Sequence, residues 1–220
     1  MTHIMNVAIH EAGHAVVAAH LHMPFSRVLL APKHCVPELP TGEKWFGMVD
    51  MRMRGSFKAK LVIIRRGRSI FSDPEAILRK KIIEHLEKHI MISYAGRLAD
   101  EIYPWGGTVS NESSAGAAKD QEDIRKFQNW QWSDDIQAEV SDSRCAQLRR
   151  RTERIIRIPY VGFAIEETAF LLATSKSRSL SGKEVRSVYR SERESVTRRG
   201  NFVGRQNLRE GEYTDGSNPT

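Results

Sequence analysis

The sequence predicts an α+β protein that is mainly helical, in which a small sheet follows the first helix and a helical bundle completes the fold. Three observations favour this class. Apolar residues with helical spacing fill residues 2–22, alternating segments follow at 26–32 and 44–53, and helical patterns dominate from residue 73. With 220 residues and 40% apolar content, the chain can bury the core of one domain, which we assign to residues 1–190.

The first helix is expected to end before Pro24, because a proline disfavours helical angles in the residue that precedes it. A proline-rich loop at residues 32–42 separates the two predicted strands, and the basic stretch 55–73 could hold another strand. The pair Asp73-Pro74 has the residue types of an N-cap and a first helical position. A long helix is therefore predicted from there to about residue 103.

The second half of the chain is expected to be helical. The predicted helices span residues 113–130, 136–158, 162–174 and a short stretch after residue 182. Ser181 can form a capping box with Glu184 at the start of the last of these. From Ser191 the chain is polar and rich in Arg, Ser and Gly, so residues 191–220 are expected to form a basic, disordered tail.

Composition and charge exclude several classes of protein. Two cysteines without Cys-x-x-Cys spacing suggest neither a disulfide framework nor a thiolate zinc site. No apolar run approaches the roughly 20 residues that cross a bilayer, and no signal peptide opens the chain, so we expect a cytoplasmic protein without a membrane span. The net charge of the chain is +7, and residues 51–81 alone carry ten Lys/Arg against two acidic residues. This segment is interpreted as a solvated face or a flap, with an anionic partner as the alternative.

The stretch AIHEAGHAVV places His10, Glu11 and His14 in a run that otherwise has the pattern of an apolar helix. Four helical residues advance about 400°, so the two histidines project from one face and can hold one Zn²⁺. Glu11 lies beside that face, where a carboxylate can act as general base on a zinc-bound water. The His-Glu-x-x-His pattern is typical of zinc metalloproteases. The alternative is a core helix with two incidentally spaced histidines.

A catalytic zinc needs a third protein ligand and an open position. The segment SSAGAAKDQED offers Asp120, Glu122 and Asp123 as candidates, and the residues alone do not choose among them. A second histidine pair, His85 and His89, also has a spacing of four, but its glutamate is at the third position of HLEKH rather than the second. We interpret this pair as solvated or half-buried helix residues rather than metal ligands.

Three stretches, in the same order, resemble the zinc protease domain of FtsH-type AAA+ proteases. AIHEAGHAVV is similar to the zinc helix of that family, YAGRLADEIYPWGG to its Gly-Arg-Ala-Ala-Glu-Glu segment, and SSAGAAKDQEDI to its Ser/Thr-x-Gly-Ala-x-x-Asp-Leu segment. The resemblance extends weakly through IEETAFLLATSKSRSLSGKEVRSVY, and so to Tyr189.

The resemblance implies a zinc-dependent endopeptidase that hydrolyses peptide bonds in peptides or unfolded proteins. It implies Asp120 as the third zinc ligand beside His10 and His14, with Glu11 as the catalytic base. It also implies a homo-oligomeric ring. The sequence departs from the family at Leu98 and Asp100, and it has no phosphate-binding Gly-rich loop with Lys-Ser/Thr. Hydrolysis is therefore expected to be ATP-independent in this chain, with a separate ATPase as an open partner.

Groups outside the ligand set should orient the histidines by accepting their other ring N–H, and Asp100 and Glu101 are the candidates. The alternative for both is a helix end that faces solvent or pairs with Arg97. An extended substrate is expected along a sheet edge in KWFGMVDM.

Two other functions stay open from the sequence. One is an adaptor or inhibitor of a larger protease that binds through the basic segment 51–81. The other is a His-Glu-x-x-His protease of the repressor-cleaving kind, whose third ligand is a glutamate.

Overall fold

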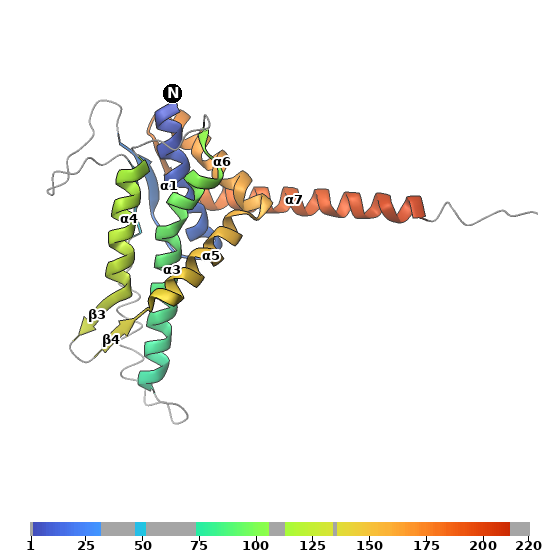
Figure 1. Cartoon of the computed structure of the whole chain (residues 1–220). Helices are drawn as coiled ribbons and strands as arrows, with labels where there is room; N and C mark the ends of the chain where they lie inside the picture. Colours follow the sequence, from blue (N-terminus) through green and yellow to red (C-terminus); the bar gives the residue numbers. More distant parts are fainter. Residues whose placement is uncertain (1, 32–46, 52–73, 106–112, 134–135, 212–220) are drawn as a thin grey trace, which may run out of the picture.

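A computed structural model describes residues 2–31, 47–51, 74–105, 113–133 and 136–211. These residues form a mainly helical α+β fold with a three-stranded antiparallel sheet and a two-stranded hairpin (Figure 1). The described helices are α1 (Thr2–His20), α3 (Pro74–Ile102), α4 (Ser113–Gln128), α5 (Asp142–Ile156), α6 (Pro159–Thr174) and α7 (Gly182–Gly211). The strands are β1 (Arg27–Leu30), β2 (Gly47–Val49), β3 (Asn129–Ser133), β4 (Ile136–Glu139) and β5 (Ser179–Ser181). The predicted fold class is thus confirmed at this level.

Helix α1 is the centre of the core. All its residues from Ala8 to Ala19 are buried, and it packs against both α3 and α6. Small side chains allow this close packing, since a Cβ added at Gly13 would lie 2.7 Å from the Ala95 carbonyl oxygen and 2.7 Å from the Ala99 Cβ. The polar side chains of α1 are therefore held inside the protein, against α3.

The three-stranded sheet has the order β2-β1-β5, and both pairings are antiparallel. Val28 of β1 is opposite Val49 of β2 and Leu180 of β5. The buried Val28, Leu30 and Leu180 belong to the hydrophobic core, and β1 contacts α1. The first two strands were predicted, though longer, whereas β5 was missed because three residues are too few for an alternating pattern.

The predicted helix at residues 136–158 is wrong in its first part. Residues 136–139 form β4, which pairs with the preceding β3 in an antiparallel hairpin, and α5 begins only at Asp142. The sequence NWQWS contains two tryptophans in alternation, which favour a strand. Ser141 marks the true start of the helix, because its side chain accepts a hydrogen bond from the Arg144 backbone N–H.

The C-terminal region also differs from the prediction. The capping box is present, since Ser181 Oγ accepts a hydrogen bond from Glu184 N–H and Glu184 Oε2 accepts one from Ser181 N–H. The helix that begins there does not stop near Ser191, as expected, but continues to Gly211 and projects away from the other helices (Figure 1). Residues 191–211 are thus described as helix, where a disordered tail was expected. Arginine and glutamate are good helix formers, and Glu194 pairs with Arg198 one turn on.

Several predicted features lie outside the described residues: the loop at 32–42, the basic stretch 55–73, the Asp73 cap and residues 212–220. Among the described helices, none is long and apolar enough to cross a membrane.

Candidate metal centre

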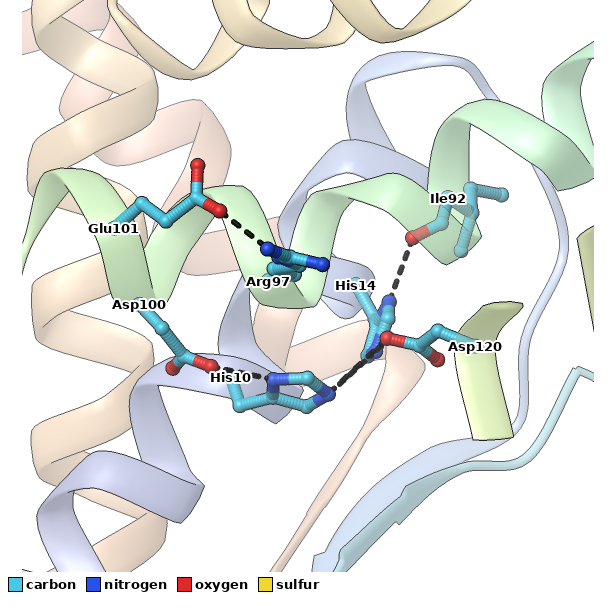
Figure 2. Close-up of polar contacts among 7 residues, drawn as sticks. All are labelled: His10, His14, Ile92, Arg97, Asp100, Glu101 and Asp120. Carbon is cyan, nitrogen blue, oxygen red and sulfur yellow. Dashed lines mark hydrogen bonds and ion pairs between the residues drawn. The ribbon is translucent and has the colours of Figure 1, made fainter. Parts of the chain in front are cut away.

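Two helices, α1 and α4, bring His10, His14 and Asp120 together. The histidines project from one face of α1, one turn apart, and Asp120 reaches them from α4 (Figure 2). The two Nε2 atoms are 3.2 Å apart, and each lies 3.3 Å from Asp120 Oδ2. The three atoms therefore form a nearly equilateral triangle in a buried site.

The other ring nitrogen of each histidine, Nδ1, already makes a hydrogen bond. His10 Nδ1 donates to Asp100 Oδ2 at 2.7 Å, and His14 Nδ1 donates to the Ile92 carbonyl oxygen at 2.6 Å. A carbonyl oxygen can only accept, so the His14 proton is on Nδ1 and its Nε2 carries a lone pair in the neutral ring. The same holds for His10 beside the Asp100 carboxylate. With both rings neutral, three acceptor atoms thus converge without a donor among them.

A metal ion fits this arrangement. Asp120 Oδ2 is buried and has no hydrogen-bond partner among the described residues. A proton could satisfy only one pair of atoms in the triangle, whereas a cation can contact all three at once. A tetrahedral zinc with bonds of about 2.0–2.1 Å spaces its ligand atoms roughly 3.3–3.4 Å apart, which matches the triangle. Two imidazoles and a carboxylate are ligands that zinc accepts.

The electrostatics of the cluster also favour positive charge. Burial alone would lower the pKa of His10, but the hydrogen bond with Asp100 and the nearby carboxylates of Asp100 and Asp120 raise it well above its usual value. Burial would raise the pKa of Asp120, yet the neighbouring His14 and His10 hold it at about 2. The carboxylate therefore stays ionised, as a metal ligand must be.

A comparison with protein-family models and with curated proteins finds no match for this chain. Function must therefore be inferred from the site itself.

Gly96 of α3 forms one wall of the site. A Cβ added there would collide with His14 Nε2 and would lie 2.7 Å from His10 Nε2. Only glycine leaves room for the two ring nitrogens to meet at this place. The site is thus shaped by α3 as well as by the residues that form the triangle.

Glu11 lies between α1 and the edge of the sheet. Its side chain is buried, and a Cβ added at Gly47 of β2 would be 2.5 Å from Glu11 Cγ and 2.8 Å from its Oε1. Burial raises the pKa of Glu11, and the charges of His14 and His10 lower it in part, leaving it above the usual value. A carboxylate with a raised pKa next to a cation site can act as a general base.

The two residues predicted to orient the histidines have different roles. Asp100 makes the expected contact with His10, but Glu101 points away from the site and pairs with Arg97 (Figure 2). Glu101 also accepts a hydrogen bond from Arg149. The prediction for Glu101 is therefore wrong, because neighbouring helix residues point about 100° apart. His14 is oriented instead by the Ile92 carbonyl, which has no signature in the sequence.

The other candidate ligands stay outside the site. On α4, Glu122 and Asp123 pair with Lys119 and Lys126 rather than with the histidines. This outcome leaves Asp120 as the carboxylate of the segment that reaches the triangle.

The second histidine pair, His85 and His89, is surrounded as structural residues are and not as metal ligands are. His89 is buried and stacks on Phe127, with ring centroids 4.9 Å apart, and its Nε2 lies 3.2 Å from His85 Nε2. Burial lowers the pKa of His89 to about 4, with His85 contributing. In the described part of the chain, the triangle of His10, His14 and Asp120 is the one cluster that could hold a metal ion. His89 is buried more deeply than the half-buried position that was expected for it.

Proposed function

We propose that this protein is a zinc-dependent endopeptidase whose metal ligands are His10, His14 and Asp120. The observation that carries the proposal is the buried triangle of three acceptor atoms with Glu11 beside it. A structural zinc is usually closed by four protein ligands, whereas three ligands leave a position open for water or substrate. A purely structural site also has no use for a buried general base. The order of the FtsH-like motifs supports the same function.

Each residue of the chain has a distinct part in this proposal. Zinc held by the three ligands would supply a Lewis acid that polarises a carbonyl group and makes water more acidic. Glu11 would accept a proton from the attacking water and then deliver it to the leaving amine. Asp100 and the Ile92 carbonyl would fix the two imidazole rings so that both Nε2 lone pairs stay directed at one point.

The sheet edge supports a peptide as the substrate. Among the described strands β2 pairs only with β1, so within the described part of the chain its other edge offers backbone groups to an extended peptide. Gly47 at the start of this strand lies directly against Glu11. A peptide added to β2 would therefore run past the general base. Peptides and unfolded proteins are the substrates that can adopt such an extended conformation without prior unfolding by ATP.

Other parts of the proposal rest on resemblance alone. A ring of identical subunits and delivery of substrates by a separate ATPase follow only from the likeness to FtsH-type domains. The alternative role of an adaptor depends on segment 51–81, most of which lies outside the described residues.

Cleavage of fluorescein-labelled casein by the zinc-loaded protein tests the proposal, with Glu11→Gln as the decisive variant. We expect Glu11→Gln to keep its zinc and to lose at least about 100-fold in rate, the usual size of general-base catalysis. Glu122→Gln, an exposed change on α4, is the control and should cleave like the wild type. Equal cleavage by Glu11→Gln and the wild type would overturn the proposed role of Glu11.

A further inference from the structure

A groove of about 670 Å³ lies between the start of α1, the end of α3, α6 and α7. We call it the acidic-aromatic groove, after the residues that line its walls: Trp105, Phe163, Phe170, Glu166, Glu167 and Glu192. Met5, Ile9 and Ile102 form apolar parts of its lining. None of these residues belongs to the metal centre or to its hydrogen bonds.

The aromatic side chains of the groove face solvent to an unusual degree. Trp105 is 49% exposed, Phe163 47% and Phe170 52%. Within the described residues, these three and Met48 are the large apolar side chains that are exposed. Three of the four therefore gather in one groove, and concentrated exposed aromatic residues are typical of binding surfaces.

The charge of the groove is opposite to that of the chain. Three carboxylates line it, while no described lining residue is Lys or Arg, although the whole chain has a net charge of +7. On α6, Glu166 and Glu167 lie between Phe163 and Phe170, so acidic and aromatic groups form one stripe on the same helical face. This combination fits a ligand that is cationic and apolar together.

The wall of the groove is held in place before any ligand binds. Tyr103, which also lines it, donates from its hydroxyl to the Ile156 carbonyl oxygen at 3.0 Å. Gly162 of α6 packs directly against the Tyr103 hydroxyl, where a Cβ would collide. A preorganised wall reduces the ordering cost of binding.

We infer that the acidic-aromatic groove binds a segment of the polypeptide substrate in which Arg or Lys accompanies apolar side chains. The guanidinium or ammonium group would contact the carboxylates and the aromatic faces, and the apolar side chains would cover Trp105 and Phe170. Ile9 precedes His10 on α1, and Ile102 follows Asp100 by two residues on α3, so the groove shares these two helices with the surroundings of the metal centre. The role as a substrate site rests on the proposed peptidase function, whereas the binding itself does not.

The test measures binding apart from cleavage. The probe is a short fluorescein-labelled peptide in which arginines alternate with leucines, and its matched counterpart has glutamine in place of arginine. Fluorescence anisotropy with zinc-loaded Glu11→Gln gives Kd without hydrolysis. The groove variant combines Glu166→Gln, Glu167→Gln and Glu192→Gln. A control with the same change in net charge combines Glu84→Gln, Glu122→Gln and Glu194→Gln, all exposed and outside the groove.

We expect the arginine peptide to bind at least about fivefold more tightly than the glutamine peptide, and the groove variant, but not the control, to remove this preference. Phe170→Ser should also weaken binding, which tests the aromatic part with the charges intact. Equal Kd values for the groove variant and the control would overturn the inference. Light scattering tests a second occupant: a wild type that is dimeric and a groove variant that is monomeric would also overturn it, because a second copy of the chain would then occupy the groove.

Casein cleavage separates this inference from the proposed function. If the wild type binds the arginine peptide as expected but cleaves no peptide, the peptidase proposal fails and the binding site stands. If the wild type cleaves casein and the groove variant changes neither Kd nor KM, the groove inference fails and the peptidase proposal stands.

Discussion

His10 and His14 turn their Nε2 atoms toward each other, 3.2 Å apart across one turn of α1, while both Nδ1 atoms donate to other groups. Two lone pairs directed at one buried point repel each other unless a positive charge lies between them. Asp120 adds a third acceptor and has no donor of its own among the described residues. The fold therefore maintains an arrangement that a bound cation would stabilise.

Replacing Asp100 by Asn tests the orientation of His10. The amide is a weaker acceptor than the carboxylate, so the His10 tautomer and ring angle are held less firmly. We expect zinc affinity to fall about 10–100-fold, as is usual when such a partner of a metal ligand is lost. Competition with a fluorescent chelator measures this affinity. Glu101→Gln is the matched control, because Glu101 pairs with Arg97 and Arg149, and unchanged affinity in both variants would contradict the account.

Gly96→Ala should abolish metal binding without unfolding the protein. The new methyl group would occupy the space between the two ring nitrogens, as the position of a Cβ at Gly96 shows. Alanine is a better helix former than glycine, so α3 itself should persist. Zinc content and circular dichroism, measured on the same sample, should show lost metal with retained helix. Full zinc content in Gly96→Ala would show that the site is built differently.

Gly47→Ala, in contrast to Gly96→Ala, should keep the metal and lose activity. Its methyl group would push against Glu11 Cγ and Oε1, and the three atoms nearest to it all belong to Glu11. We therefore expect a normal zinc content together with a fall in kcat of at least about tenfold, since a displaced general base transfers protons poorly. A variant that loses zinc and activity together would mean that β2 supports the metal ligands instead.

The buried His89 should make stability depend on pH. The folded-state pKa is about 4, against about 6.5 in the unfolded chain, so the unfolded state binds more protons below pH 6.5. Stability contributed by the neutral ring is therefore present above pH 6.5 and is lost as the pH falls toward 4. Between pH 7 and 5 the loss should be about 2 kcal/mol.

Urea unfolding with a chelator present measures this loss without any contribution from bound metal. His89→Gln cannot titrate, so its free energy of unfolding should fall by less than that of the wild type over the same pH range. Parallel decreases in the two proteins would show that other groups cause the pH dependence.

The local sequence signals predicted some elements well and others poorly. The apolar spacing of α1, the long α3 and the capping box of Ser181 and Glu184 are local features, and the structure contains all three. The β3–β4 hairpin was missed because the start of β3 was included in the helix predicted at 113–130 and β4 in the helix predicted at 136–158. The continuation of α7 beyond Ser191 was missed because a polar helix lacks the apolar period that identifies most helices.

In the candidate site, too, the sequence predicted the local features and missed those that depend on tertiary packing. His10, Glu11 and His14 lie within one helical turn, so their spacing alone predicts their relation. Asp120 followed from resemblance, and the structure places it at the two histidines. Tertiary packing decides the rest: which of Asp100 and Glu101 faces inward, and which glycines leave room for the site.

Zinc content per chain, after dialysis against a weak chelator, tests the central claim most directly. The wild type and Asp123→Ala, a change on the same helix beside the lysines, should each retain about one zinc ion, while Asp120→Ala should lose most of it. A wild type without bound zinc, or an Asp120→Ala variant that keeps it, would contradict the assignment of His10, His14 and Asp120 as the ligands.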